Sequence, residues 1–150
     1  MKKLEENIIL FYLEPRLGNS GETHKELEKN LNKKKKETLN IMLNRRNNVM
    51  KTREVLLKGD IKKFAELLNE EHKQKETLNS KTTTEKSKIF YDAAMKNGAI
   101  AGKISGAGQG GCAFFICKKE NQERVIKKLS SMGAVYLPLK MQRLNHMGEI

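Results

Sequence analysis

The chain is poor in the residues that brace small extracellular folds and that bind metals. Its 150 residues include no tryptophan, two prolines, two cysteines and three histidines, and aromatic residues make up 5%. Cys112 and Cys117 lie five positions apart on one expected strand, so they point to opposite faces and cannot bridge. The histidines show no spacing typical of metal ligands. Free thiols, with no signal peptide and no apolar run of membrane-spanning length, predict a cytoplasmic protein.

The charged residues are not balanced. Lysine and arginine number 30 against 18 acidic residues, which gives a formal net charge of +12 at pH 7. Such an excess fits either a surface that binds nucleic acid or another polyanion, or solvated helix faces rich in lysine. Aromatic residues are not interleaved with the basic runs Lys33–Lys36 and Arg45-Arg46, as a single-strand binder would require. We therefore favour solvated helix faces and keep polyanion binding as the alternative.

Glycine is concentrated in one segment. Four of the six residues from Gly106 to Gly111 are glycine, and apolar runs flank them at Ala99–Ile104 and Cys112–Cys117. Glycine loses more backbone freedom on folding than other residues, so a dense cluster indicates positive φ angles or the close approach of another group. A Rossmann loop or a P-loop would lead into a helix, whereas this loop leads into a strand.

Two interpretations of this loop compete. It is either a tight or bulged turn between antiparallel strands, or a loop that faces a ligand. The loop has more glycine than a hairpin needs, and it carries the small polar residues Ser105 and Gln109. These features favour a ligand-facing loop whose successive amides form an anion-binding nest.

Apolar periodicity and breaker residues predict the other elements. The expected strands are Glu6–Leu13, Ala99–Ile104, Cys112–Cys117 and Val135–Leu139. A loop at Leu17–Gly21 precedes a helical region that extends to Leu57, either as one long helix or as two joined near Asn44–Asn48. Further helices are expected at Ile61–Leu78, from the polar break at Asn79–Thr84 to Asn97, and at Gln122–Met132.

The same pattern predicts helix ends and core positions. Thr23 with Glu26, and Thr82 with Glu85, have capping-box spacing, while Gly59 ends one helix and Asp60 caps the next. The first strand is expected to be buried on both faces, and Pro138 indicates that the last strand lies at an edge or ends there. Steps of three and four separate the apolar residues of the first helical region, which are Leu27, Leu31, Leu39, Met42, Leu43, Val49, Met50, Leu56 and Leu57. The later helices carry apolar sides formed by Phe64, Leu67 and Leu68, by Ile89, Phe90, Ala93 and Ala94, and by the inward residues Val125, Ile126, Leu129 and Met132.

This order of elements predicts a single α+β domain over residues 1–150. Strand, helix, strand, strand, helix and strand follow one another, with extra helices in the first crossover. The arrangement matches a ferredoxin-like antiparallel four-stranded sheet with helices on one face.

The residues at Lys103–Cys112, KISGAGQGGC, resemble the third signature motif of the GHMP kinases. The family pattern is close to K-L-S-G-A-G-G-G-G, and only Ile104 and Gln109 depart from it. The whole chain resembles the C-terminal half of such kinases.

Other segments resemble the branch of D-glycero-D-manno-heptose 7-phosphate kinases in particular. These segments are Leu78–Thr84, Ile89–Ala94, and the strand Ile9–Tyr12 followed by Arg16 and Ser20. The segment Leu13-Glu14-Pro15 departs from that branch, and fucokinase-type kinases are its neighbours.

The resemblance implies phosphoryl transfer from ATP, with Mg²⁺, to a hydroxyl of a small sugar or sugar phosphate. In complete kinases of this family, the third motif packs against the phosphate-binding loop of the N-terminal domain. The residues that it places nearest substrate or phosphate are Ser105, Gly106, Ala107, Gly108 and Gly110. Lys103 is expected either to point into the cleft or to point out to solvent.

The family's N-terminal phosphate-binding motif, P-x-x-x-G-L-x-S-S-A, has no counterpart here. Pro15–Ser20 shares letters with it but not its spacing. The resemblance puts the catalytic aspartate and the magnesium carboxylate in the missing half or at its junction, so no catalytic residue or metal ligand is assigned to this chain. We expect the chain alone to be inactive and to bind no cofactor tightly. Its expected partners are the sugar or sugar phosphate, the N-terminal half, and a second copy through an exposed cleft face, with no membrane.

The alternative is a basic ferredoxin-like module that binds RNA or another polyanion. Such a sheet would expose aromatic side chains on its central strands, and Phe114, Phe115 and Tyr136 are the candidates. Salt-sensitive RNA binding would favour this function.

Overall fold

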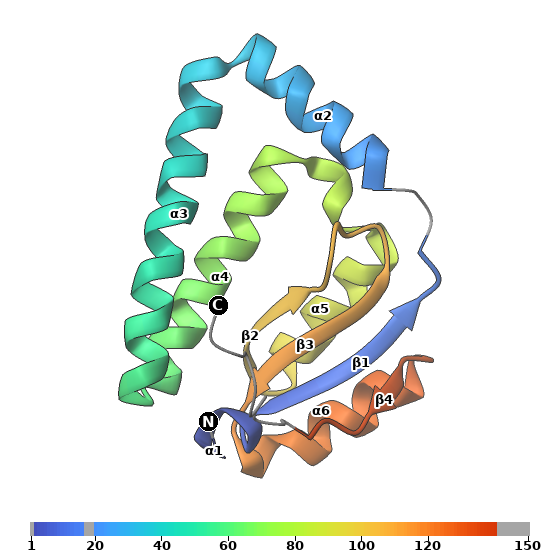
Figure 1. Ribbon diagram of the computed structural model, residues 1–150. Helices are drawn as coiled ribbons and strands as arrows, with labels where there is room; N and C mark the ends of the chain where they lie inside the picture. The colour runs from blue at the N-terminus through green and yellow to red at the C-terminus, as the bar shows by residue number, and fades with distance from the viewer. Residues whose placement is uncertain (1, 17–19, 141–150) are drawn as a thin grey trace, which may run out of the picture.

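The computed structural model describes residues 2–16 and 20–140, apart from the side chains of residues 2, 20, 22–24, 26, 27 and 81. The order of its elements is α1 (Lys2–Glu5), β1 (Ile8–Glu14), α2 (Ser20–Lys33), α3 (Lys35–Lys58), α4 (Ile61–Leu78), a 3₁₀ turn at Ser80–Thr82, α5 (Glu85–Lys96), β2 (Ala99–Ile104), β3 (Gly111–Cys117), α6 (Lys119–Ser131) and β4 (Val135–Leu137) (Figure 1).

The four strands form one antiparallel sheet in the order β2-β3-β1-β4. Central β3 pairs with β2 on one side and β1 on the other, and β4 lies at the far edge. This order and the α+β class confirm the ferredoxin-like prediction. The edge position of β4 is also as expected.

Helices α5 and α6 cover one face of the sheet and enclose the main core. Alternate residues of β1 and β3 point into this core, among them Phe11 and Phe115, which are both fully buried. From the helices come Phe90 and Ala94 on α5 and Val125 and Leu129 on α6. These four residues were expected on the apolar, inward sides of their helices. Ile89 was also expected there, but it is 60% exposed, so that expectation was wrong.

The extra helix α4 packs on the opposite face, over the β2 end of the sheet. Phe64, Ala65 and Leu68 of α4 contact Ala101 and Ile116 there. Figure 1 shows α3 and α4 side by side next to β2, with α5 behind the sheet. Because α4 reaches only one edge, the β1–β4 part of this face stays uncovered by the described helices.

This uncovered part corrects the expectation that the first strand is buried on both faces. Residues of β1 alternate between buried and more exposed positions, and Tyr12 is 38% exposed. Tyr12 pairs across the sheet with Cys112 on one side and with Val135 on the other. Val135 is 54% exposed, so an apolar strip crosses the open face.

The long helical region breaks at Lys34, and the expected junction near Asn44–Asn48 was wrong. The side chain of Asn30 donates to the Leu78 carbonyl oxygen at 2.7 Å, which ties α2 to the end of α4. The Thr38 hydroxyl donates to the Asn30 carbonyl oxygen at 3.2 Å and closes the corner. The break falls within the run of four lysines, where like charges weaken a continuous helix.

Helix α3 is oriented differently from the expectation. Its outward positions include Leu39, Met42, Leu43, Val49, Met50 and Leu57, which are 39–72% exposed, so the apolar period that predicts this helix does not mark a buried face. Its buried residues are Thr38 and Asn48. The helix meets α4 through a partly polar seam because an ion pair between Arg45 and Glu71 joins the two helices.

The helix ends predicted from Gly59 and Asp60 are confirmed by the structure. Gly59 adopts the left-handed conformation, with φ 68°, and the Asp60 side chain accepts from the Lys63 amide at 2.9 Å. The capping box at Thr82 was wrong, because Thr84 caps α5 by accepting from the Ser87 amide at 2.9 Å. Helix α2 begins at Ser20, so Thr23 does not start it.

Some of the sequence predictions concern residues that the structure does not describe. These are residues 17–19 of the expected loop, the side chains of Ser20, Thr23, Glu26 and Leu27, and His146.

Candidate functional site

The glycine loop joins β2 to β3 through an unusual run of backbone conformations. Gly106, Gly108, Gly110 and Gly111 have φ angles of 70°, 93°, 102° and 87°. Gln109 also has a positive φ, 64°, which is uncommon for a residue with a side chain. The first reason for the glycine cluster is therefore that the backbone needs left-handed conformations, which glycine adopts without strain.

Two of the glycines are also needed because protein backbone lies against them. A Cβ at Gly108 would stand 2.2 Å from the Thr82 carbonyl oxygen, and one at Gly110 would stand 2.6 Å from that of Pro15. The Gln109 amide donates to the same Thr82 oxygen at 2.8 Å. The loop is thus clamped between the turn that precedes α5 and the segment that follows β1.

The five predicted site residues fall into two groups. Gly108 and Gly110 are buried against the protein, whereas Ser105 and Gly106 are exposed and Ala107 is half-buried. A Cβ at Gly106 would meet only the tip of Arg16, at 3.5 Å. Within the described part of the chain, the amides of Gly106 and Ala107 donate to no protein acceptor. The stretch available to a ligand is therefore Ser105–Ala107.

Basic side chains surround this stretch. Lys75 of α4 donates from Nζ to the Gly106 carbonyl oxygen at 2.8 Å, and Arg16 donates from Nε to the Gly108 carbonyl oxygen at 3.2 Å. Among the described residues, no carboxylate lies within ion-pairing distance of Lys75. Both contacts leave positive charge next to the exposed amides.

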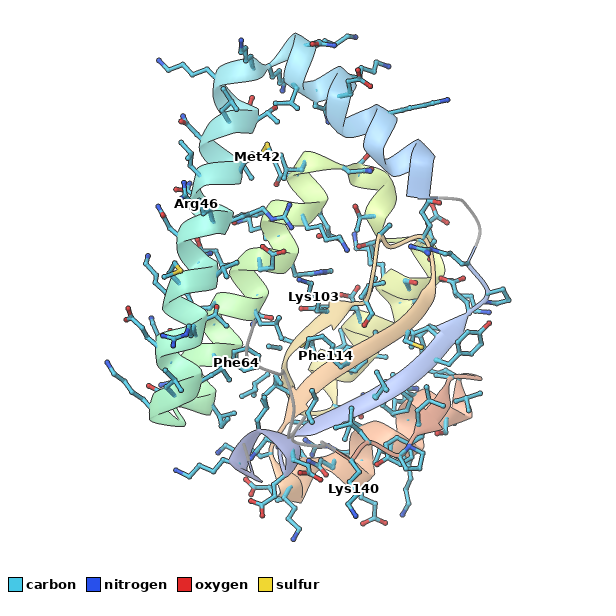
Figure 2. All side chains as sticks on the ribbon, in the orientation of Figure 1. Met42, Arg46, Phe64, Lys103, Phe114 and Lys140 are labelled. Carbon is cyan, nitrogen blue, oxygen red and sulfur yellow. The ribbon has the colours of Figure 1, made fainter. Side chains whose placement is uncertain are left out.

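Lys103 of β2 is directed toward α4 rather than out to solvent. Its Nζ lies 3.2 Å from Glu71 Oε1 on α4, and Figure 2 shows it between that helix and the sheet. Arg45 of α3 donates to both oxygens of the same carboxylate, at 3.0 and 2.7 Å. One carboxylate thus serves two cations from two different elements.

The charges of this cluster perturb its pKa values. Burial alone would raise the pKa of Glu71, but the hydrogen bond from Arg45 and the charge of Lys103 outweigh burial and hold that pKa below its usual range. Burial, together with the charges of Lys103 and Arg45, lowers the pKa of Lys75 to about 8. Positive charge is therefore in excess at this end of α4.

A buried carboxylate supports the loop from behind. Glu14, at the end of β1, is 5% exposed and accepts hydrogen bonds from the hydroxyls of Thr84 and Ser87, the latter at 2.6 Å. It ties β1 to the start of α5 and stands beside Gly110. The departure at Leu13-Glu14-Pro15 therefore has a structural role in this chain.

Sequence reasoning missed Lys75, Glu71 and Arg45. The spacing of Glu71 and Lys75, four residues apart on a helix, puts them on one face. That signal is common on solvated helices, and only the tertiary contacts to Lys103 and Gly106 distinguish it here.

The described residues do not fit a magnesium site. Glu71, the carboxylate of this cluster, is held by Arg45 and Lys103. No group of three or more His, Cys, Asp or Glu side chains converges anywhere in residues 2–16 and 20–140.

The sheet does not offer the aromatic platform that RNA binding would need. Phe115 is fully buried, Phe114 packs against the α4 cluster, and Tyr136 stands at the edge with its ring centroid 5.6 Å from that of Phe11. None of the helices in the described part of the chain has the length and hydropathy that a bilayer-spanning segment requires.

Comparison with known proteins supports the resemblance. The sequence model of the family "GHMP kinases C terminal" matches residues 52–135. A D-glycero-alpha-D-manno-heptose 7-phosphate kinase from Campylobacter jejuni is 31% identical over 80 residues, which are 53% of this chain and 24% of that protein. A galactokinase from Streptococcus mutans is 29% identical over 87 residues, which are 58% of this chain and 22% of that protein.

Solved structures show the same fold. A mevalonate kinase from L. major superposes with a TM-score of 0.74 and 18% identity, over 83% of this chain and 37% of that one. The aligned region therefore spans about a quarter of each curated relative and well under half of the solved kinase.

Proposed function

Since this chain belongs to the GHMP kinase family through its C-terminal domain, we propose that it forms the C-terminal domain of an ATP-dependent sugar kinase of the heptose-phosphate type. Residues 1–150 are one such domain, and an N-terminal half supplies the phosphate-binding loop, the magnesium ligands and the catalytic base. The acceptor is a sugar or sugar phosphate, and the two free thiols suit a reducing cytoplasm.

The observation that carries this proposal is the exposed backbone at Ser105–Ala107 with cations around it. Phosphoryl transfer requires little covalent chemistry from the protein. It depends on positioning of the reactants and on electrostatic stabilisation of the transferred group. The free amides of Gly106 and Ala107, with Lys75 beside them, supply donors and positive charge where phosphate oxygens would lie. Gly108 and Gly110 hold that backbone rigidly from behind.

The open face of the sheet is the surface on which we place the N-terminal half. It carries the apolar strip formed by Cys112, Tyr12 and Val135 across three strands. An exposed apolar strip of this kind is typical of an interface. The crevice for phosphoryl transfer would then lie between that half and the glycine loop.

The test is turnover by the two-domain protein, in which an N-terminal kinase half precedes this chain. Release of ADP is measured with heptose phosphates and with neutral sugars as acceptors. We expect turnover that requires ATP, an acceptor and both halves, and no turnover by either half alone. Turnover by the isolated chain, or none by a folded two-domain protein with any sugar acceptor, would refute the proposal.

A further inference from the structure

The glycine loop is fixed by contacts with two segments that lie far from it in the sequence. The first segment, residues 14–16, follows β1. The Pro15 carbonyl oxygen would stand 2.6 Å from a Cβ at Gly110, and Arg16 donates from Nε to the Gly108 carbonyl oxygen at 3.2 Å. This segment therefore holds the second half of the loop.

The second segment is the turn at residues 82–84, which precedes α5. The Thr82 carbonyl oxygen accepts from the Gln109 amide at 2.8 Å, and it would stand 2.2 Å from a Cβ at Gly108. We call residues 14–16 and 82–84 together the loop clamp. The loop keeps its position only while both segments of the clamp keep theirs.

One buried carboxylate joins the two segments of the clamp. Glu14 is 5% exposed, and its Oε1 accepts from the hydroxyls of Thr84 and Ser87, the latter at 2.6 Å. The Thr84 hydroxyl also accepts from the Ser87 amide at 2.9 Å, so it caps α5 at the same time. Among the described residues, no lysine or arginine lies within ion-pairing distance of Glu14. The two hydroxyls are therefore what joins this carboxylate to the turn before α5.

The exposed stretch Ser105–Ala107 is held mainly at its two ends. At one end the Ser105 amide donates to the Cys112 carbonyl oxygen at 2.8 Å. Lys75 donates to a carbonyl oxygen in the middle of the stretch. At the other end the stretch continues into residues 108–110, which the loop clamp contacts. The position of the exposed amides therefore depends on the clamp.

We propose that Glu14 is a positioning residue for phosphoryl transfer. By joining residues 14–16 to residues 82–84, it fixes the exposed amides of the glycine loop where the transferred group needs them. Glu14 acts through Thr84 and Ser87 and does not itself contact a reacting atom. Small displacements at such a site are costly, so a loose clamp slows the reaction more than it weakens binding. This inference rests on the proposed function and adds a residue on which its rate depends.

The first experiment tests the clamp in the 150-residue chain without any assay of catalysis. Hydrogen exchange at the Gln109 amide is followed by NMR in the parent, in Glu14→Leu and in Glu14→Gln. Leucine offers no acceptor to the two hydroxyls, so we expect exchange at Gln109 to become roughly tenfold faster, the effect of losing one buried hydrogen bond. Glutamine keeps an acceptor oxygen, and its exchange should stay within about threefold of the parent.

The Phe115 amide, on central β3, shows whether the change is local. We expect its exchange to be the same in Glu14→Leu as in the parent, because the clamp does not hold the centre of the sheet. Unchanged exchange at Gln109 in Glu14→Leu would overturn the proposal. Equal acceleration at Gln109 and Phe115 would also overturn it, because Glu14 would then support the whole fold rather than the loop.

The second experiment measures kcat and KM in the two-domain protein. Glu14→Leu should lower kcat about tenfold or more and leave the KM for ATP within about twofold of the parent, as expected for lost positioning. Glu14→Gln should restore kcat to within about threefold. If Glu14→Leu does not fold, Ser87→Ala takes its place, since it removes one of the two hydrogen bonds, and it should lower kcat about threefold. A kcat equal to that of the parent in the folded variant would overturn the proposal.

Gln122 provides a matched control at the opposite end of β1 and β3. Its side chain donates to the Glu6 carbonyl oxygen at 2.7 Å and to the Cys117 carbonyl oxygen at 3.2 Å, so it also joins two segments. Gln122→Leu should leave kcat within about twofold of the parent. Equal losses of kcat in Glu14→Leu and Gln122→Leu would refute the positioning role while the kinase function stands. A folded two-domain parent without ATP-dependent turnover would refute both.

Discussion

The glycines of the loop have different physical roles. Gly108 and Gly110 combine positive φ angles with protein backbone at less than 3 Å from a would-be Cβ, whereas Gly106 has a positive φ with only the tip of the Arg16 side chain nearby, at 3.5 Å. The first two are needed for folding. A side chain introduced at Gly106 would instead occupy space that is available to a ligand.

This difference predicts the stability of two variants. Gly108→Ala should lower the free energy of unfolding by roughly 2–4 kcal/mol, because the methyl group strains the backbone and collides with the Thr82 carbonyl. Gly106→Ala should lower it by about 1–2 kcal/mol, from the positive φ alone. Urea unfolding followed by circular dichroism measures both. Equal losses would show that the loop is not clamped at Thr82.

At this scale the sequence located the loop but not the charges around it. Glycine density marks a backbone requirement directly, so the segment Gly106–Gly111 could be found from the letters alone. Lys75 looks like an ordinary helix residue in the sequence. Its significance arises from its contact with a loop 31 residues away.

Among the elements, α3 departs most from its sequence pattern. Its apolar residues at Leu43 and Met50 are 54% and 62% exposed, while Asn48 between them is buried. An apolar period along a helix predicts a buried face only when nothing stronger fixes the rotation of the helix. Here the bidentate pair between Arg45 and Glu71 turns a polar seam toward α4.

We therefore expect polar substitutions on the outer face of α3 to be tolerated. Leu43→Gln and Met50→Gln should each change the free energy of unfolding by no more than about 0.5 kcal/mol. Leu68→Ala, in the α4 cluster that packs on the sheet, should lower it by about 2–5 kcal/mol. Chemical denaturation measures all three, and a loss above 2 kcal/mol at Leu43 or Met50 would mean that α3 is rotated toward the core.

The order of elements could be predicted because each boundary has a local cause. Gly59, Asp60 and Asn97 end or begin helices through their own backbone and side-chain bonds, and β2 occupies the expected residues. The break at Lys34 could not be predicted. It depends on where Asn30 meets the end of α4, which is a tertiary contact.

In the whole molecule, helices α5 and α6 cover one face of the sheet, and the other face is partly open. The two cysteines report on these faces, since Cys112 is half-buried on the open side and Cys117 is fully buried in the main core. Burial also raises the pKa of Cys117 to about 11. Alternation along β3 predicted their opposite directions, but not which face would stay open.

A thiol reagent should therefore distinguish the two residues. In the isolated chain at pH 8, we expect Cys112 to be modified at least about tenfold faster than Cys117, because burial restricts access to Cys117 and its raised pKa keeps it protonated. Mass spectrometry after partial labelling gives the two rates, and Cys112→Ser should abolish the fast phase. Addition of the N-terminal half should slow labelling of Cys112. Rapid modification of Cys117 would contradict the described core.

The central claim is that the exposed backbone at Gly106 borders a phosphoryl-transfer crevice, and two matched variants of the two-domain kinase test it most directly. Gly106 and Gly133 both have positive φ angles, 70° and 95°, and neither would bring a Cβ within 3.4 Å of another atom, but Gly133 lies after α6, away from the loop. In steady-state assays of ATP-dependent sugar phosphorylation, we expect Gly106→Ala to lower kcat/KM about tenfold or more, since small displacements at a phosphoryl-transfer site are costly. Gly133→Ala should remain within about twofold of the parent, and equal effects of the two substitutions would contradict this account.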